Sequence, residues 1–163
     1  MEPKHTFNIL LLLVFYSSAC IGILLPMGDV IAEILPGIHT EAQIIFISSI
    51  FLMVGAGTSF IWAFLAAKIS RRKLLIVATL IWSVAMLITP ISRDFLSLLL
   101  FQIFTAIGFG AVLPLTYSMI VDLFDIEKRG HAFGLKETFY VLGVGAAQIL
   151  SGFMIDLYPW YVP

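Results

Sequence analysis

The chain has 163 residues, of which 61% are hydrophobic and 12% are charged, with a formal net charge of −1 at pH 7. Because soluble domains average about 25% charged residues, this composition excludes an ordinary soluble domain. The near-neutral charge gives no indication of a nucleic-acid partner. The single cysteine, Cys20, cannot form an intrachain disulfide.

The hydrophobic residues are gathered in long blocks, which predict membrane-spanning helices. About 20 consecutive apolar residues cross the hydrocarbon core of a bilayer, whereas a transmembrane barrel would show short alternating segments. Five blocks reach roughly this length, at approximately residues 7–31, 41–67, 73–91, 95–123 and 132–157. The sequence therefore predicts an all-α, multi-pass membrane helix bundle.

The first block is expected to be a retained span and not a cleaved signal peptide. Residues 17–20 resemble a lipoprotein cleavage site, but the apolar run continues to Leu25 and the residues before it carry a single lysine. The second block begins after Thr40, which with Gln43 matches a capping-box pattern. Thr40 is therefore predicted to be the N-cap of the second span.

Lysine and arginine gather on one side of the predicted spans. Four lie between residues 68 and 73, after the second span, and two more follow the fourth span at residues 128 and 129. The opposite side carries only Arg93. Because positive residues stay in the cytoplasm, the N-terminus and these two loops are predicted to be cytoplasmic and the C-terminus to lie outside.

Small residues recur every four positions along several spans. Helices in lipid gain little from burying leucine, so small residues mark places where helices approach closely. Small residues at this spacing more often pack helices together than contact a solute. The positions with this spacing that we expect to pack helices together include Gly55, Ser59, Ala63, Gly110 and Gly143. Pro114 predicts a bend in the fourth span, because a proline inside a helix removes one backbone hydrogen bond.

Two charged residues, Lys136 and Glu137, lie inside the fifth span. A carboxylate in a span is a candidate for proton relay or for pairing with a substrate cation. Alternatively, Lys136 extends to the cytoplasmic interface and Glu137 pairs with a basic loop residue. The sequence leaves both interpretations open. Gln148 lies eleven residues beyond Glu137, on nearly the same helix face.

The loop after the second span resembles the cytoplasmic loop of the major facilitator superfamily of transporters. That loop reads G-x-L-a-D-r-x-G-r-(r/k)-x-x-l, and residues 63–75 read AFLAAKISRRKLL. Both glycines and the acid of the pattern are replaced, by Ala63, Ser70 and Ala67. The residues that match the pattern are Leu65, Ala66, Lys68, Arg71, Arg72 and Leu75.

Two later segments are similar to further motifs of that family. Residues 102–110 resemble its helix-four motif through Gly108 and Gly110, although Gln102 stands where the family has arginine. The helix-five spacing of glycines is kept at Gly134, Gly143 and Gly152. Gly108 and Gly152 therefore join the expected packing positions. Together the motifs resemble the amino-terminal half of such a transporter, and residues 81–83 are similar to the Spinster-like branch.

The resemblance implies alternating access, in which two six-helix halves rock about a central solute site. It also implies that Arg71 or Arg72 pairs with Asp122, at the inner end of helix four, to lock the outward-facing state. The mostly apolar and aromatic side chains of the first, fourth and fifth spans favour an amphipathic or hydrophobic solute over a sugar. The expected cavity or coupling residues are Gln102, Tyr117, Glu137, Tyr140 and Gln148.

Five spans fall one short of a six-helix half, so the chain is expected to be a fragment or truncated product. Its expected partners are the lipid bilayer, a small solute and either a carboxy-terminal half or a second copy. The alternative is a small, non-transporting membrane subunit that binds a partner through its glycine, alanine and serine faces. No enzyme, metal or cofactor is expected, because His5, His39 and His131 lack metal-ligand spacing.

Overall fold

The computed structural model describes residues 3–24, 31, 35, 37–38 and 40–154. Within this part of the chain the regular elements are helices, and no strand is present. They are α1 (Pro3–Leu24), α3 (Glu41–Ala66), α4 (Arg71–Ile88), the 3-10 helix η1 (Thr89–Ile91), α5 (Phe95–Phe109), α6 (Val112–Leu123) and α7 (Ile126–Met154). The predicted all-α class is confirmed. Most of residues 25–31 and residues 155–157, which were assigned to the first and fifth spans, lie outside the described residues.

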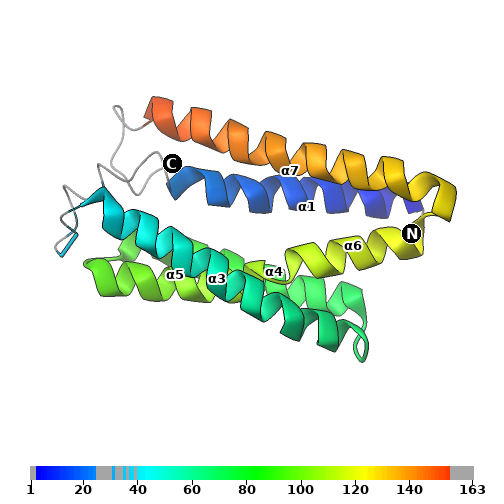
Figure 1. Cartoon of the computed structure of the whole chain (residues 1–163), viewed down its shortest axis with the longest axis horizontal. Coiled ribbons are helices and arrows are strands. Elements are labelled where there is room, and N and C mark those ends of the chain that lie inside the picture. The colour runs from blue at the N-terminus through cyan, green and yellow to red at the C-terminus, as the bar shows by residue number, and fades with distance from the viewer. Residues whose placement is uncertain (1–2, 25–30, 32–34, 36, 39, 155–163) are drawn as a thin grey trace.

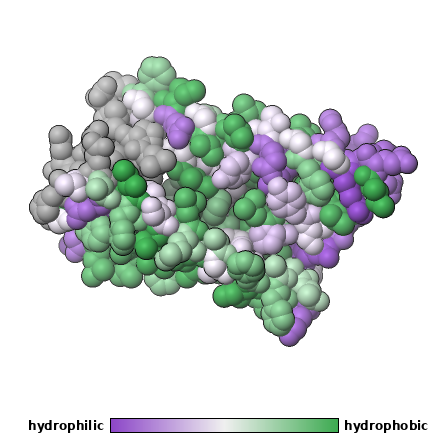
Figure 2. Space-filling model, viewed as in Figure 1, coloured by the Kyte–Doolittle hydropathy of each residue, from purple (hydrophilic) through white to green (hydrophobic). Residues whose placement is uncertain are grey.

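Four helical segments of the described chain are long and apolar enough to cross a membrane. They are Lys4–Ile23, Ala42–Ala66, Arg71–Ile91 and Phe95–Leu123, and they correspond to the first four predicted spans. At 29 residues α7 is long enough, about 43 Å at 1.5 Å per residue. The charged residues in its first half make it more polar than the others. Much of the visible helix flank is hydrophobic, whereas hydrophilic residues gather where α6 meets α7 (Figure 2).

The helices form two groups that α6 connects. Helix α1 packs along α7, while α3 and α4 both pack against α5. Helix α6 contacts α1, α3, α4 and α7, and Figure 1 shows it between the α1–α7 pair and the α3–α4–α5 group. The N-terminus, the start of α4, the end of α6 and the start of α7 share one end of the bundle. We call this the basic end, because it carries residues 68–73 and 128–129.

The fourth span is bent between α5 and α6. Gly110 and Ala111 are the two residues between the helices, and the Ala111 N–H bonds only three residues back, to the Gly108 carbonyl at 3.2 Å. Pro114 is the third residue of α6, so it has no N–H to donate to the Gly110 carbonyl. The predicted bend is confirmed, one turn before the proline that causes it.

Three of the small-residue positions lie where helices approach closely. A Cβ atom added to Gly108 would lie 2.6 Å from the Ala78 carbonyl oxygen, because α5 packs directly on α4. A Cβ at Gly110 would meet α3 at the Gly55 carbonyl oxygen, 2.5 Å away. One at Gly143 would overlap α1 at Ser18. These three glycines therefore permit the contacts that define the bundle.

The other expected packing positions behave differently. Gly55 is buried and Ser59 is half-buried, but Ala63, further along the same face of α3, is exposed. At Gly152 an added Cβ would meet no described atom within 4 Å. The spacing alone did not single out Gly22, which packs against the α7 backbone at Val144.

Hydrogen-bonded caps fix the helix starts at the end opposite the basic end. Thr40 is the N-cap of α3, as predicted, and its N–H donates to Gln43 Oε1 at 3.3 Å. Asp94 caps α5, where its carboxylate accepts from the Ser97 N–H at 2.8 Å. This backbone hydrogen bond, followed by a bond from the Ser97 side chain, lowers the pKa of Asp94 below its ordinary value.

Candidate functional site

An ion pair closes the basic end of the bundle. Arg71 is the first residue of α4, and its guanidinium pairs with the carboxylate of Asp122 in the last turn of α6. The same Nη1 donates to the Ser118 carbonyl oxygen at 3.4 Å. Each charge sits at the unfavourable end of its own helix dipole, a cation at an N-terminus and an anion at a C-terminus. The ion pair offsets both unfavourable interactions with the helix dipoles. The two charges are therefore explained by the contact between the helices and not by the helix that carries each of them.

The resemblance left open whether Arg71 or Arg72 pairs with Asp122, and the structure distinguishes the two. Arg71 reaches Asp122, whereas Arg72 is exposed and lines a groove between α1 and α4 with Thr6 and Leu75. Leu65 and Ala66 pack against a buried cluster around Trp62 and Leu115. Lys68 lies with its Nζ atom 4.3 Å from the ring centroid of Phe64. The loop motif thus supplies one interhelical ion pair, and its apolar residues pack in a cluster shared with α6.

A second arginine contact, which sequence reasoning missed, holds the turn between α6 and α7. Arg129 donates from Nε to the Phe124 carbonyl oxygen at 3.0 Å and from Nη2 to the Val121 carbonyl oxygen at 2.9 Å. Carbonyl groups at a helix C-terminus lack partners within the helix, and a cation there is favoured by the dipole. Arg129 therefore fixes the end of α6 that carries Asp122.

The charged residues of α7 meet α6 in a compact cluster. Lys136 is 1% exposed, and its Nζ atom donates to Glu137 Oε1 at 2.8 Å. The Tyr117 hydroxyl donates to the same carboxylate oxygen. The Lys136 Nζ atom also lies 4.3 Å from the ring centroid of Tyr117 and 5.7 Å from that of Tyr140. We call these four residues the α6–α7 cluster.

In the α6–α7 cluster the cation is buried and the anion is partly exposed to solvent. The Glu137 side chain is 46% exposed, whereas that of Lys136 is 2% exposed. A buried ammonium is stable only when it is paired, and here a carboxylate and two aromatic faces stabilise it. The alternative in which Lys136 extends to the interface and Glu137 pairs with a loop residue is wrong, because the two side chains pair with each other.

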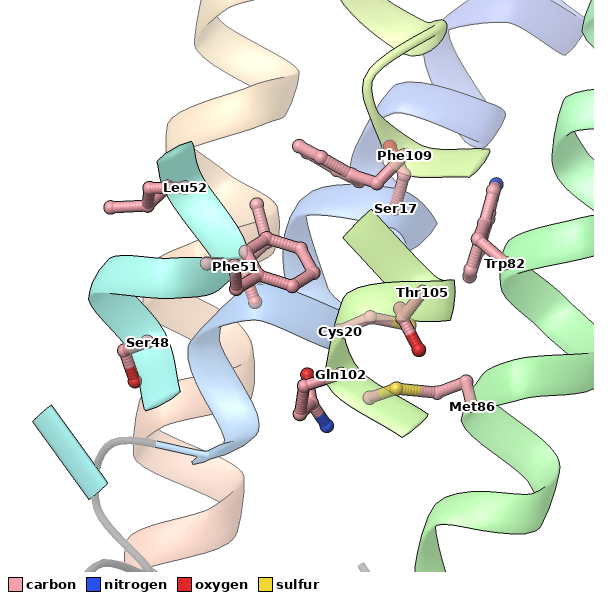
Figure 3. A pocket seen from close by; sticks show the side chains of 11 residues that line it. Ser17, Cys20, Ser48, Phe51, Leu52, Trp82, Met86, Gln102, Thr105 and Phe109 are labelled. Carbon is pink, nitrogen blue, oxygen red and sulfur yellow. The ribbon is translucent and has the colours of Figure 1, made fainter. Parts of the chain in front are cut away.

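The remaining expected cavity residues lie apart from the α6–α7 cluster. Gln102 is buried in α5 and lines a cavity between α1, α3, α4 and α5, together with Trp82 of α4 (Figure 3). Gln148 is exposed on α7 and joins neither site. In the part of the chain that the structure describes, no group of three histidine, cysteine, aspartate or glutamate residues could hold a metal ion.

Comparisons with known proteins agree with this architecture. Residues 7–163 match the Major Facilitator Superfamily. The chain is 26% identical over 136 residues to NiaP of Bacillus subtilis, a protein named for niacin and nicotinamide transport, covering 80% of this chain and 34% of the relative. It is also 29% identical over 107 residues to the arabinose-proton symporter of the same organism, covering 64% of this chain and 22% of that protein.

A solved structure shares the fold. It is a bacterial homologue of the human lysosomal transporter Spinster, in an inward-facing and occupied conformation. The match has a TM-score of 0.76 at 20% identity and covers 94% of this chain and 33% of that one. The chain thus spans about a fifth to a third of the length of these proteins. Since the family match extends over nearly all of its residues, the chain belongs to the Major Facilitator Superfamily.

Proposed function

We propose that this chain is part of a secondary transporter that moves a small solute across a membrane by alternating access. The ion pair between Arg71 and Asp122 carries the proposal, because it joins α4 to α6 at the loop that resembles the family's gating motif. The basic end is cytoplasmic, as the lysine and arginine distribution favours. The remaining helices come from a carboxy-terminal half or from a second copy of the chain.

An ion pair acts as a latch when it forms in one conformation and breaks in the other. It then biases the equilibrium between these states by its own interaction free energy. Arg71 and Asp122 are 35% and 56% exposed, and such pairs contribute about 0.2–1 kcal/mol. The latch therefore changes the ratio of the two states by at most about fivefold. A change of this size alters the populations of the two conformations but leaves both accessible to the transporter.

The α6–α7 cluster serves as the coupling site. The exposed carboxylate of Glu137 is held by Lys136 and Tyr117, so a proton or a solute cation that binds Glu137 weakens the hold on a buried ammonium. That change in contacts gives the two conformations different affinities for the bound species, as coupling requires. The mostly apolar and aromatic side chains of the spans favour an amphipathic solute over a strongly hydrated one.

Uptake into liposomes tests the proposal. The full-length protein is reconstituted and given labelled nicotinamide, nicotinate or arabinose, because relatives are named for transport of these or closely related solutes. Saturable uptake that falls at least tenfold in Glu137→Gln, but not in Glu127→Gln in the exposed first turn of the same helix, supports transport with coupling at Glu137. Protein that takes up no solute but binds a partner through its small-residue faces would indicate the non-transporting subunit instead.

A further inference from the structure

The carboxylate of Glu137 is the accessible charged group of the α6–α7 cluster. Its Oε1 atom accepts from the Lys136 ammonium and from the Tyr117 hydroxyl. Its Oε2 atom has no hydrogen-bond partner in the part of the chain that the structure describes. Because the side chain is 46% exposed, this second carboxylate oxygen is free to accept a hydrogen bond from a bound molecule.

The surface of α7 is open on both sides of Glu137. A Cβ atom added to Gly134, one turn before Glu137, would meet no described atom within 4 Å. Val141, one turn after Glu137, is 66% exposed. Residues three and four apart share one face of a helix, so the carboxylate has an open approach on one side and an apolar side chain on the other. A molecule can therefore reach the carboxylate and pack on Val141.

Aromatic rings border the same carboxylate. Tyr117 is 37% exposed, and its ring centroid lies 5.2 Å from that of Phe133. Phe133 is one turn before Glu137 on the same face of α7, so both rings lie beside the carboxylate. The face of an aromatic ring carries partial negative charge and attracts cations. The surface around Glu137 thus combines a full negative charge with two rings that also favour a cation.

An anionic ligand does not fit this arrangement. The Lys136 side chain is 2% exposed, and its ammonium is paired with Glu137, so a ligand carboxylate cannot reach it. Such a ligand would meet the Glu137 carboxylate instead. A ligand ammonium at Oε2 would lie closer to this carboxylate than to the ammonium behind it. Because Coulomb energy falls with distance, the attraction exceeds the repulsion.

A proton is also a poorer occupant than an organic cation. A proton on Glu137 would remove the counter-charge of the almost fully buried Lys136, and an unpaired buried charge is strongly destabilising. An ammonium bound at Oε2 leaves Glu137 ionised. The two cations then share the carboxylate, which weakens the bond to Lys136 without removing it.

We infer that the α6–α7 cluster binds an amphipathic organic ammonium ion. Its N–H group donates to Glu137 Oε2, and its apolar body packs on the side chains that flank the carboxylate, which are Tyr117, Phe133 and Val141. The inference rests on the proposed transport function for its role in solute recognition. Binding itself does not require transport, so the two proposals are tested separately.

Equilibrium binding to the purified full-length protein in detergent, near neutral pH, tests the site with three probes of similar shape. Benzylammonium is a cation, benzyl alcohol is neutral and benzoate is an anion. We expect benzylammonium to bind about tenfold tighter than benzyl alcohol, because a charge-assisted hydrogen bond is roughly twice as strong as a neutral one. Benzoate should bind most weakly of the three, since it meets a like charge.

Substitutions at and near the carboxylate identify the site. Glu137→Gln should abolish the tenfold preference for benzylammonium, whereas Glu127→Gln, in the exposed first turn of α7, should keep it. Phe133→Leu retains an apolar side chain without a ring, so the preference should fall about two- to fivefold. If Glu137→Gln does not fold, the double variant Lys136→Met with Glu137→Gln decides, because it leaves no unpaired charge buried.

Three results would overturn the inference: no binding of benzylammonium, equal binding of benzylammonium and benzyl alcohol by the wild type, or a preference that survives in Glu137→Gln. Selective binding of benzylammonium without uptake of any labelled solute into liposomes would refute the transport proposal alone. Uptake that depends on Glu137, in a protein without preference for benzylammonium, would refute the solute class alone.

Discussion

Arg71 and Asp122 form an ion pair between the first residue of α4 and the last turn of α6. The contact joins the α3–α4–α5 group to the helix that also touches α1 and α7. It therefore closes the basic end, while the cavity beside Trp82 lies further along the bundle. A change at the ion pair therefore removes a link between α4 and α6 at the basic end.

Asp122→Asn is expected to shift the conformational balance of the full-length protein by about two- to fivefold, the range for an exposed ion pair. The shift is measured by the labelling rate of a single cysteine at Ser48, in a Cys20→Ser background. Ser48 lines the cavity, so its accessibility reports the state of the end opposite the ion pair. The exchanged pair, Arg71→Asp with Asp122→Arg, should restore the wild-type rate.

Asp125→Asn is the matched control for this experiment, because Asp125 is an exposed acid three residues beyond Asp122. It removes the same charge from the same end of the bundle without touching the ion pair. If Asp125→Asn changes labelling as much as Asp122→Asn does, the effect is one of net charge. The latch would then be rejected.

Substituting Glu137 and substituting Lys136 should lower the free energy of unfolding by unequal amounts. Glu137→Gln leaves an ammonium that is almost fully buried, so it should cost about 2 kcal/mol or more. Lys136→Met leaves a carboxylate that is 46% exposed and can be hydrated, so it should cost at most about 1 kcal/mol. Thermal unfolding in detergent compares the two variants. A larger loss in Lys136→Met would contradict the observed burial.

Features that depend on local chain chemistry could be predicted from the sequence. The N-cap at Thr40 follows from a hydroxyl and an amide at capping-box spacing. The bend before Pro114 follows from a missing N–H. The spans follow from block hydrophobicity, which reflects transfer into lipid and needs no knowledge of neighbours.

Features that depend on which helices meet could not be predicted in the same way. Ala63 belongs to the same four-residue stripe as Gly55, yet it is exposed, whereas Trp62 beside it is buried against Leu115 of α6. Lys136 is paired inside the bundle because α6 brings Tyr117 over it, and no spacing within α7 indicates that contact. The unmet N–H groups of Trp82 and Gln102 likewise depend on packing between separate helices.

Close packing of α7 on α1 gives a further prediction. In Gly143→Ala the new methyl group would overlap Ser18 and the Phe15 carbonyl, so the variant should lose about 1–3 kcal/mol. Gly145→Ala, two residues along the same helix, would meet no described atom within 4 Å and should gain about 0.5–1 kcal/mol of helix stability. Thermal unfolding measures both. Equal effects would show that α7 does not approach α1 as described.

The cap at Asp94 makes stability depend on pH in a defined direction. Its folded-state pKa is lowered, chiefly by the hydrogen bond from the Ser97 backbone N–H, so the ionised carboxylate stabilises the folded state. That stabilisation is present above the ordinary pKa of 3.8 and is lost as the pH falls through the lower folded-state value. Asp94→Asn keeps a capping oxygen but cannot titrate, which makes it the matched variant. The difference in Tm between wild type and Asp94→Asn should be constant near neutral pH and should shrink in acid. A difference that grows as the pH falls would show that the carboxylate is not stabilised by this cap.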